Sequence, residues 1–503
     1  LVGAAGATSA VAGGDCDGVA CDIATCEVAP NSSTTSAGNG FGWLIGGASR
    51  ALAGLSIGAV LHRIQQPRGR VVSHMVKRRD DAGPDRLRGR FPLWFFRMAR
   101  RCAAGEPVAG CRASYGAGMF FGGRMERSEV IIIGAGIGGL AAALGLQRAG
   151  VQVRIYEQAP ALGEVGAGLS ISPNGALGLK SLGVFDEFRD VAFAADEQCV
   201  RHFQTGRVLA TVERGDRLED TYGERYYVVH RADLHRVLAD AVLANDPAAI
   251  VTSHRFADLQ QDNSGVSVRF DNGEWKRAQA VIGADGVRSR VRSTLFGAEE
   301  VRFTGFVAWR GLVPMELVPK EALDPPAQVW IGPGHMINRY PVRGGKLLNF
   351  VAFAERSGWE EEGWSIPAKV EELANEFKDW HPWIRQIIAA VPEKDLFKWA
   401  LCARSALMRW VRGRAAVLGD AAHPLLPYLG QGAVMAIEDA VLLGRAFHEA
   451  ADVPEALARY EGARVGRARF VVERSTLMVP RYHSPDPDSF RHDVPVDEAL
   501  GLF

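Results

Sequence analysis

Three glycines with a fixed spacing are the first residues in this chain whose types indicate a chemistry. Gly134, Gly136 and Gly139 form a GxGxxG motif directly after the apolar run VIII at 130–133. In such a motif we expect Gly134 to make a tight turn, Gly136 to let the backbone approach a pyrophosphate, and Gly139 to let a helix pack closely on its strand. Glu157 lies 23 residues after Gly134, where its carboxylate would accept hydrogen bonds from a ribose. The motif predicts a dinucleotide site, which both NAD and FAD would fit.

Two apolar strands and a helix are needed to hold these residues in place. The run at 130–133 is typical of a buried parallel strand, GLAAALGLQRA at 139–149 of a helix, and VQVRIY at 151–156 of a second strand that ends at Glu157. In this order the helix begins at the glycine turn, so its N-terminus would face the phosphates. The segment therefore predicts a Rossmann-like α/β domain.

Two acidic residues at later strand ends decide between the cofactors. Asp285 follows a predicted strand in AQAVIGADGVRSRVRSTLFG at 278–297, and Asp420 follows another in GRAAVLGDAAHPLLPYLGQGAVMAIEDAVLLGRAF at 413–447. An NAD site has no need of an acidic strand end so far along the chain. FAD does, because its ribitol chain and flavin ring extend away from the adenosine half. The sequence therefore predicts bound FAD.

In this order and spacing, the three segments resemble the class A flavoprotein aromatic hydroxylases, most closely the group of salicylate hydroxylase, 3-hydroxybenzoate 6-hydroxylase and 6-hydroxynicotinate 3-monooxygenase. The resemblance covers essentially all of 125–503. It implies an α/β fold in which a Rossmann-like FAD-binding domain carries an inserted antiparallel-sheet substrate domain and C-terminal helices. We expect the FAD-binding domain at 125–303, with part of the substrate sheet near 196–228. The substrate domain follows at 304–401, and 402–503 complete the FAD-binding domain and add the helices.

The resemblance also assigns residues to the cofactor. Gly138, Glu157 and Gln158 would hold the adenosine half, Arg231 would face FAD, and Asp285 belongs to a loop near the pyrophosphate and the passing nicotinamide. Asp420 would bind the ribitol, and backbone N–H groups of Gly432 and Ala433 would meet the pyrimidine edge of the flavin, where a helix N-terminus stabilises an anion. The full expected set is Gly134, Gly136, Gly138, Gly139, Glu157, Gln158, Arg231, Asp285, Asp420, Gly432 and Ala433.

A predicted antiparallel sheet supplies the substrate half. Segments 304–317, 327–342 and 346–355 are each interpreted as a strand, with a tight turn at 344–345 that joins the last two into a hairpin. Such a sheet would form one wall of the active site over the flavin ring. The aromatic and apolar candidates for its lining are Trp309, Trp330, Met336 and Tyr340.

The activity that the resemblance implies is hydroxylation of an aromatic ring. NADH or NADPH, as a transient co-substrate, would reduce FAD, and reduced flavin would trap O2 as a hydroperoxide that attacks an electron-rich ring. We expect a monooxygenase that acts on a hydroxylated aromatic acid such as salicylate. The expected partners are this small substrate and O2, with no nucleic acid and no membrane.

Three residues are candidates for catalysis. Tyr340 lies in INRYPVRGG, which corresponds to the segment that carries a substrate-facing tyrosine in relatives. Several relatives place a histidine four residues earlier, where this chain has Met336 and His335 stands one position before it. Because neighbouring strand residues point to opposite faces, His335 would serve only on a bulged strand. Pro424 begins a loop that would shield the site from water, and His423 before it is interpreted as structural.

The substrate itself stays open. Pyridine-hydroxylating relatives carry a histidine where this chain has Ser170, which argues against 6-hydroxynicotinate, and Pro427 replaces a glutamine of some 3-hydroxybenzoate enzymes. A salicylate-type substrate remains, with Arg339 or Arg310 as the partner of its carboxylate. The alternatives are a flavin-dependent epoxidase of an alkene, a flavin-linked oxidase or dehydrogenase, and a non-catalytic protein that keeps the FAD fold.

Composition bounds the remaining possibilities. The chain has 503 residues, 47% hydrophobic and 23% charged, which is a globular balance. Its formal net charge of zero gives no sign of nucleic-acid binding, although 1–124 hold 15 basic and 8 acidic residues and 125–503 hold 43 and 50. Beyond the leader the cysteines are Cys199 and Cys402, which suggests a reducing, cytoplasmic location. No metal site is predicted, and a monomer or a homodimer is expected.

The first 124 residues differ from the rest of the chain. They form a low-complexity leader that we expect to be disordered or non-native, with Met125 as the hypothetical start of translation. Its most apolar run, 41–61, contains Arg50 and many glycines and is a poor candidate for a membrane span.

Overall fold

The structure is a computed structural model that describes residues 129–163, 168–299, 302–358 and 366–490. The expectations about the leader at 1–124 and about a start at Met125 lie outside the described residues.

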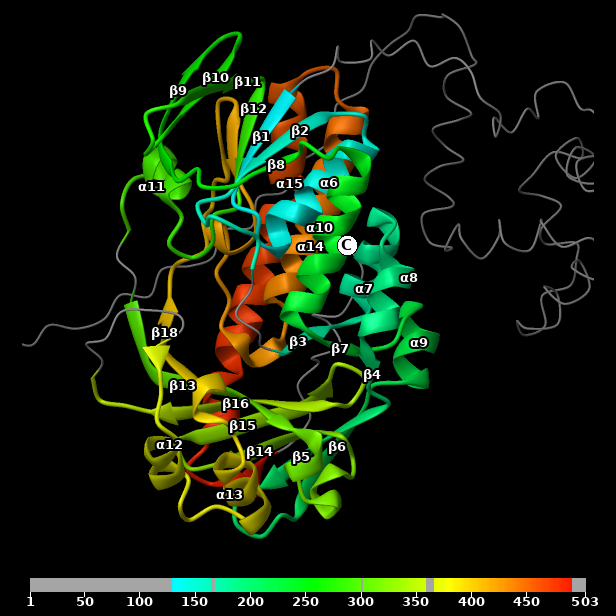
Figure 1. The fold of residues 1–503 in the computed structure, drawn as a ribbon, viewed down its shortest axis with the longest axis vertical. Coiled ribbons are helices and arrows are strands. Elements are labelled where there is room, and N and C mark those ends of the chain that lie inside the picture. The colour runs from blue at the N-terminus through cyan, green and yellow to red at the C-terminus, as the bar shows by residue number, and fades with distance from the viewer. Residues whose placement is uncertain (1–128, 164–167, 300–301, 359–365, 491–503) are drawn as a thin grey trace, which may run out of the picture. The chain divides into compact units, whose positions relative to one another are not determined.

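A six-stranded sheet carries the predicted nucleotide-binding end of the fold (Figure 1). All of its strands run parallel except the edge strand β19. Residues 130–133 are fully buried in it, because helices cover both faces of a parallel sheet. The strands, in spatial order, are β19 (Val411–Arg412), β20 (Ala415–Val417), β12 (Ala280–Gly283), β1 (Glu129–Ile133), β2 (Gln152–Tyr156) and β8 (Ile250–Val251).

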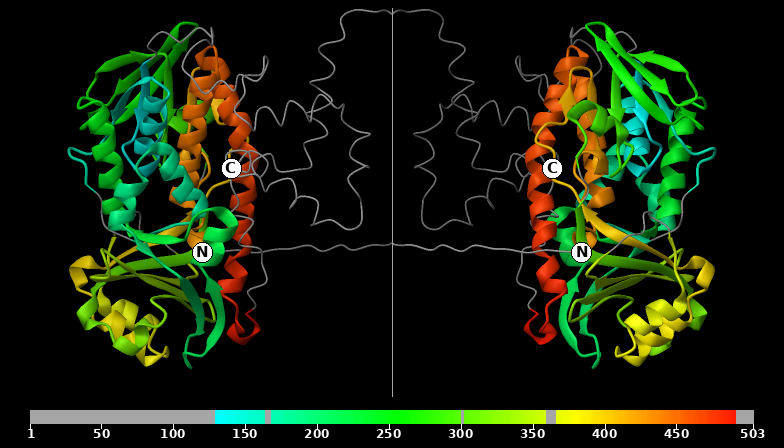
Figure 2. Two further views of the ribbon diagram at one scale, coloured as in Figure 1. Left: turned by 90° about the vertical axis from the view of Figure 1, so that its right-hand side faces the viewer. Right: turned by 90° about the vertical axis from the view of Figure 1, so that its left-hand side faces the viewer.

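Helix α6 (Ile137–Arg148) connects β1 to β2 and is nearly all buried. It packs against α10 (Arg231–Asn245) and α14 (Gly432–Glu449), and α15 (Val453–Leu477) lies beside α14 (Figure 2). This arrangement confirms the predicted Rossmann-like α/β fold. Further helices of the described chain are α7 (Pro173–Leu182), α8 (Phe185–Val191), α9 (Asp216–Tyr222), α11 (Arg290–Phe296) and α16 (Val479–Tyr482), and two more pack on the second sheet described below.

An eight-stranded, mainly antiparallel sheet forms the other half of the fold (Figure 1). Strands far apart in the sequence meet in it, since β5 and β14 pair in parallel. In spatial order the strands are β17 (Ile366–Pro367), β18 (Phe397–Ala403), β13 (Arg302–Pro314), β16 (Leu347–Glu355), β15 (His335–Val342), β14 (Ala327–Gly332), β5 (Glu197–His202) and β6 (Val208–Glu213).

The predicted hairpin between β15 and β16 is present, with positive φ angles at Gly344 and Gly345. The interpretation of 327–342 as one strand was wrong. It contains two strands, β14 and β15, which pair with each other across a turn at Pro333 and Gly334, where Gly334 has a φ of 67°. The Pro-Gly pair is the turn signal that separates them.

One face of the eight-stranded sheet has a core of its own. Trp309 and Trp330 are fully buried there, in a cluster with side chains of α12 (Val370–Glu376) and α13 (Pro382–Ala389). The expectation that these two tryptophans line the active site is therefore wrong. The opposite face of the sheet turns toward the helices of the nucleotide half.

Two small antiparallel sheets complete the fold. One consists of β9 (Phe256–Asp262), β10 (Gly265–Phe270) and β11 (Trp275–Ala278). The other consists of β3 (Gly168–Ile171), β7 (Tyr227–His230) and β4 (Phe193–Ala194), and it lies between the six-stranded and the eight-stranded sheets (Figure 1). The second sheet brings Ser170 toward Tyr340 of β15.

Candidate active site

A cavity of about 410 Å³ lies between the two halves of the fold. This volume is within the range of small-molecule and cofactor sites. Residues from the first glycine motif, from the turns after β12 and β20 and from the start of α14 line one part of it. The lining residues on this side include Gly136, Ile137, Gly138, Arg231, Ala284, Gly286, Leu418, Gly419, Asp420, Gly432 and Ala433.

The three motif glycines differ in what surrounds them. Gly134 has a φ of 102°, and a Cβ there would lie 2.7 Å from the carbonyl oxygen of Ala284. A Cβ at Gly139 would lie 2.0 Å from the carbonyl oxygen of Gly134, so only glycine lets the helix approach the turn. At Gly136, in contrast, a Cβ would meet no heavy atom of the described chain within 4 Å. Gly134 and Gly139 therefore permit the packing, while Gly136 borders the cavity.

Glu157 joins the ends of the first two strands. Its carboxylate accepts hydrogen bonds from the backbone N–H groups of Ala135 at 2.8 Å and Ala159 at 2.9 Å. These bonds hold the acid beside the glycine turn. Glu157 is outside the cavity lining, and the neighbouring Gln158 is exposed.

The Asp285 side chain accepts hydrogen bonds from its own loop. Its carboxylate accepts hydrogen bonds from the Ser289 hydroxyl at 2.5 Å and from the backbone N–H groups of Arg290 at 2.7 Å and Val291 at 3.1 Å, at the start of α11. Its neighbours Ala284 and Gly286 line the cavity and Asp285 does not. The side chain therefore fixes a loop whose backbone faces the site.

Asp420 and Arg231 form the charged part of the cavity. Asp420 lines the cavity, and burial by the surrounding protein raises the pKa of this carboxyl. Burial lowers the pKa of Arg231 to about 10, and the charge of Asp420 opposes this shift. Arg310 of β13 also lines the cavity and adds a positive charge near Arg231. The two opposite charges suit a polar, partly anionic cofactor.

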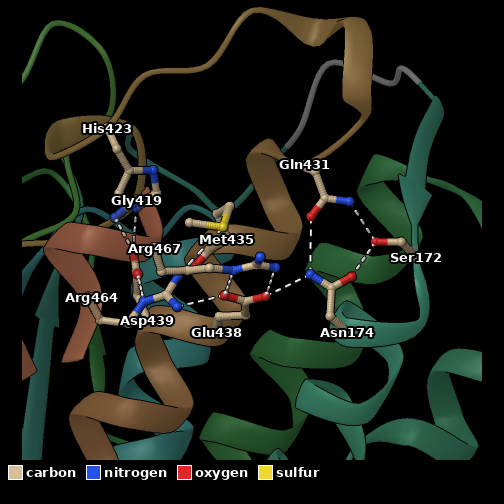
Figure 3. A network of polar contacts seen from close by, with 10 residues as sticks. All are labelled: Ser172, Asn174, Gly419, His423, Gln431, Met435, Glu438, Asp439, Arg464 and Arg467. Carbon is tan, nitrogen blue, oxygen red and sulfur yellow. Dashed lines mark hydrogen bonds and ion pairs between the residues drawn. The ribbon is translucent and has the colours of Figure 1, made fainter. Parts of the chain in front are cut away.

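A buried polar network holds the turn that carries Asp420 (Figure 3). Asp439 of α14 accepts hydrogen bonds from the backbone N–H of Gly419 at 2.9 Å, from His423 at 2.7 Å and from Arg464 at 2.6 Å. His423 is fully buried, with its ring 5.1 Å from that of Trp410. This position agrees with a structural residue.

The network continues to the start of α14. Glu438 pairs with Arg464 at 2.6 Å and accepts a hydrogen bond from Asn174 at 2.6 Å. Asn174 also bonds to Gln431 at 3.1 Å, and Gln431 donates to Ser172 at 2.8 Å. These contacts anchor the helix end where Gly432 and Ala433 present their backbone to the cavity (Figure 3).

Alternate residues of β15 line the substrate part of the cavity. Met336, Asn338 and Tyr340 face it, together with apolar side chains of β14, β16 and the loop at 425–428. Tyr340 is buried, which raises the pKa of its hydroxyl, while the Ser170 hydroxyl opposes this shift. The result is a mainly aromatic and apolar compartment with a few polar groups.

The same alternation corrects two expectations. His335 lies on the opposite face, where its ring nitrogens contact Glu376 and the Pro333 carbonyl oxygen, each at 2.7 Å. The pairing of β15 with both neighbours is continuous, so no bulge turns His335 toward the cavity. Arg339 is fully buried on that face too and donates to the carbonyl oxygen of Ala322. His335 is therefore not placed to act as a base, nor Arg339 to bind a substrate in the cavity.

Pro424 is also outside the lining. Leu425, Leu426 and Pro427, the next residues of the same loop, are the ones that border the cavity. Among the lining residues that the sequence analysis did not name are Gln198 near the start of β5 and Arg214 just after β6. Neither carries a motif, and each reaches the cavity through pairing between distant strands.

Comparison with known proteins identifies the class to which this fold and site belong. Residues 127–475 match the family model described as FAD binding domain. The structure is similar to Klebsiella pneumoniae HpxO complexed with FAD and uric acid, with a TM-score of 0.65, 30% identity and coverage of 74% of this chain and 91% of the other. The chain is therefore a flavoprotein of the FAD-dependent monooxygenase fold, and FAD is its cofactor, as predicted.

Within this class the chain belongs to the family of FAD-dependent aromatic hydroxylases. It is 37% identical over 362 residues to 3-amino-4-hydroxybenzoate 2-monooxygenase PtnB3 of Streptomyces platensis, covering 72% of this chain and 90% of the relative. It is 36% identical over 358 residues to 3-hydroxybenzoate 6-hydroxylase of Polaromonas naphthalenivorans, covering 71% and 88%. The resemblance drawn from the three motifs is thus confirmed.

The described residues hold neither a candidate metal site nor a candidate membrane span. No cluster of three or more His, Cys, Asp or Glu residues there is arranged to hold a metal ion. No helix among the described residues is long and apolar enough to cross a membrane.

Proposed function

We propose that this chain uses NADH or NADPH and O2 to hydroxylate an aromatic acid that already carries a hydroxyl group. The observation that carries the proposal is the single cavity, which joins the FAD-binding loops to an aromatic compartment with Tyr340 and Ser170 at its edge. The two curated relatives are named for action on an aminohydroxybenzoate and a hydroxybenzoate. A flat, phenolic acid of this size suits the compartment.

The residues around the cofactor fit FAD. The space at Gly136 accommodates a pyrophosphate, and the start of α14 offers backbone N–H groups to an electron-rich ring edge. Asp420 is placed to accept hydrogen bonds from hydroxyl groups and Arg231 to balance negative charge. Bound FAD supplies the redox chemistry that activates O2 with electrons from the nicotinamide.

Tyr340 then serves as a hydrogen-bond donor to the phenolic oxygen of the substrate. Burial raises the pKa of its hydroxyl, so the side chain stays protonated at neutral pH. It therefore stabilises a phenolate without removing the proton. The described lining holds no histidine, and Asp420 is its one carboxylate, so the histidine base known from relatives has no counterpart at this position.

The loop at 425–427 excludes water from the reacting ring. Leu425, Leu426 and Pro427 present apolar surface to the cavity, which Met336 and Phe353 also line. Exclusion of water prevents the hydrolysis of reactive intermediates and strengthens the electrostatic contacts inside the site. We further propose that the nicotinamide approaches transiently along the Ala284–Gly286 loop. The two described cysteines are unpaired, in keeping with a cytoplasmic monomer or homodimer.

The test is substrate-stimulated oxidation of the nicotinamide. The purified full chain with its FAD is mixed with NADH or NADPH and with a panel of hydroxybenzoates, phenols and alkenes, and products are identified by mass spectrometry with isotope-labelled O2. The proposal expects stimulation by a hydroxybenzoate and one labelled oxygen in the ring. An epoxide from an alkene would instead favour the epoxidase, and unstimulated oxidation with every compound would contradict the proposal.

A further inference from the structure

Arg214 is a buried cation at the wall of the cavity. The residue follows β6, its exposed fraction is 8%, and it is one of the lining residues. One guanidinium nitrogen donates to the Oε1 atom of Gln198 at 2.9 Å, and the guanidinium carbon lies 4.4 Å from the ring centroid of Tyr226. Its Nε is buried and has no hydrogen-bond partner in the described chain. The guanidinium is therefore held in place while part of its hydrogen-bonding capacity is unused.

No described carboxylate neutralises this charge. Within the described residues, no ion pair of 4.0 Å or less involves Arg214. The acidic side chains nearest in sequence, Glu213 and Asp216, are exposed and pair with Arg217 and Arg225 instead. A buried charge that lacks a counter-charge is costly, and proteins normally pair it. The missing partner of Arg214 is thus an anion that enters the cavity.

We propose that Arg214 binds the carboxylate of the aromatic substrate, a proposal that rests on the function proposed above. A guanidinium matches a carboxylate with two parallel hydrogen bonds. Arg214 lines the cavity, and Gln198 accepts from only one of its guanidinium nitrogens. Gln198 positions the guanidinium from one side and the Tyr226 ring supports it from below by a cation–π contact. Arg214 takes the role expected for Arg339 or Arg310.

The location of Arg214 also fits a substrate that carries two polar groups. Tyr226, which contacts the Arg214 guanidinium, packs in the same buried cluster as Tyr340, and all three residues line the cavity. On the proposal, a single ring places its carboxylate at Arg214 and its hydroxyl at Tyr340. Arg310, in contrast, lies near Arg231 and stacks on Phe397 and Trp399, toward the cofactor.

The experiment compares the wild type and a variant, each with a charged and an uncharged ligand. Arg214→Gln removes the charge and keeps much of the volume. The two ligands are the hydroxybenzoate that best stimulates NADH oxidation in the wild type and its uncharged carboxamide. We expect the KM of the hydroxybenzoate to rise roughly 30-fold or more in the variant, because truncating a buried charge pair has an effect of this order. The KM of the carboxamide should change by less than about 3-fold, because it makes no charge-assisted bond to Arg214.

Arg217→Gln is the matched control, since it removes an exposed cation three residues away that does not line the cavity. It should leave both KM values unchanged. FAD content measured by absorbance verifies folding of each variant. Arg214→Lys, which keeps the charge without the planar fork, should fall between the wild type and Arg214→Gln. Equal losses for both ligands, or no loss for the hydroxybenzoate, would overturn the proposal.

Two measurements distinguish a failure of the Arg214 proposal from a failure of the proposed function. If Arg214→Gln retains no FAD, the affinities of the wild type for the two ligands test the role of Arg214. The wild type should bind the hydroxybenzoate roughly 30-fold more tightly than the carboxamide. Equal affinity would overturn the role of Arg214. If no aromatic acid stimulates NADH oxidation by the wild type, the proposed function fails. Equilibrium dialysis of the hydroxybenzoate with wild type and variant then still tests the carboxylate site.

Discussion

Arg464 lies at the centre of the buried network beneath the flavin-facing turn, and its replacement by methionine is a demanding test of that network. The guanidinium is fully buried and pairs with Glu438 and with Asp439, each at 2.6 Å. Methionine has a similar length and no charge. The variant would leave two adjacent buried carboxylates whose remaining ion-pair partners in the described chain are His423 and the more distant Arg467.

The expected loss follows from the cost of leaving a charge buried without its partner. Breaking one buried ion pair typically costs about 3–5 kcal/mol. Arg464 makes two such pairs, but His423 and Arg467 keep part of the compensation, so we expect a loss of about 4 kcal/mol in the free energy of unfolding at pH 8. Asp439 also holds the backbone N–H of Gly419, so FAD affinity should fall as well.

The loss should depend on pH in a defined direction. Burial raises the pKa of Asp439, but the charges of His423 and Arg464 outweigh it and keep the pKa below its usual value. Without Arg464 the burial effect prevails, and the folded variant takes up a proton. A raised folded-state pKa contributes stability at low pH that is lost as the pH rises. The variant should therefore be closest to the wild type near pH 5.5 and furthest from it at pH 8.

Urea unfolding of the FAD-depleted protein at both pH values, and fluorescence titration with FAD, measure these effects. Arg467→Met is the matched control. The side chain of Arg467 is 17% exposed, and its contact with Glu438 is 3.2 Å. Its loss should cost only about 1 kcal/mol. A loss below about 1 kcal/mol for Arg464→Met, or equal losses for the two variants, would refute the argument that this network supports the cofactor turn.

Four further substitutions test the site. Gly136→Ala should lower FAD affinity roughly 10-fold or more and leave the apoprotein stable, because its Cβ points into the cavity. Gly139→Ala should lower both FAD affinity and stability, because its Cβ would meet the Gly134 carbonyl oxygen. FAD titration and urea unfolding distinguish the two variants. Tyr340→Phe should retain FAD and lower kcat/KM for the phenolic substrate roughly 10-fold or more, and an unchanged value would exclude the proposed donor. His335→Gln should leave kcat unchanged and cost about 1 kcal/mol of stability between pH 4.5 and 6.5. Burial opposes protonation of His335, but hydrogen bonds to Glu376 and to the Pro333 carbonyl raise the net pKa of its ring. The contribution of the His335–Glu376 pair to stability is therefore lost as the pH rises above 6.5. It is also lost at low pH, where Glu376, whose pKa is lowered in the folded protein, becomes protonated.

The nucleotide half was predictable because its determinants are local. The glycine turn, its strand and its helix lie within 130–149, and the shortest contact that a Cβ at Gly139 would make, with the Gly134 carbonyl oxygen, arises inside this unit. The clash at Gly134, in contrast, is with Ala284 of the distant loop after β12. The period of two in β15 was equally informative, since it predicted that His335 and Met336 point to opposite faces. Sequence spacing alone left open which face borders the cavity, and pairing with β14 and β16 decides it.

The buried charges were not predictable in the same way, because their partners are far apart in the sequence. Asp439 meets Arg464 across two helices, and Asn174 reaches Glu438 from a different part of the chain. One signal did exist. Glu438 and Asp439 are adjacent acids in the otherwise apolar helix AVMAIEDAVLLG, where buried carboxylates require cationic partners. The tryptophans of the eight-stranded sheet carried no such signal, because core and cavity positions favour the same side chains.

The two ends of the cavity differ in whether their charged side chains have partners within the described chain. At the cofactor end Asp420 faces Arg231, and the acids below the turn are paired with Arg464 and His423, so this end holds its shape from interactions within the chain. At the substrate end Arg214 has a neutral amide and an aromatic ring beside it and no acid. On the proposal made for Arg214, an anionic substrate would complete the compensation there, and a neutral ring of the same shape would not. The proposal therefore predicts selection for aromatic acids over simple phenols, while the aromatic walls would accept either.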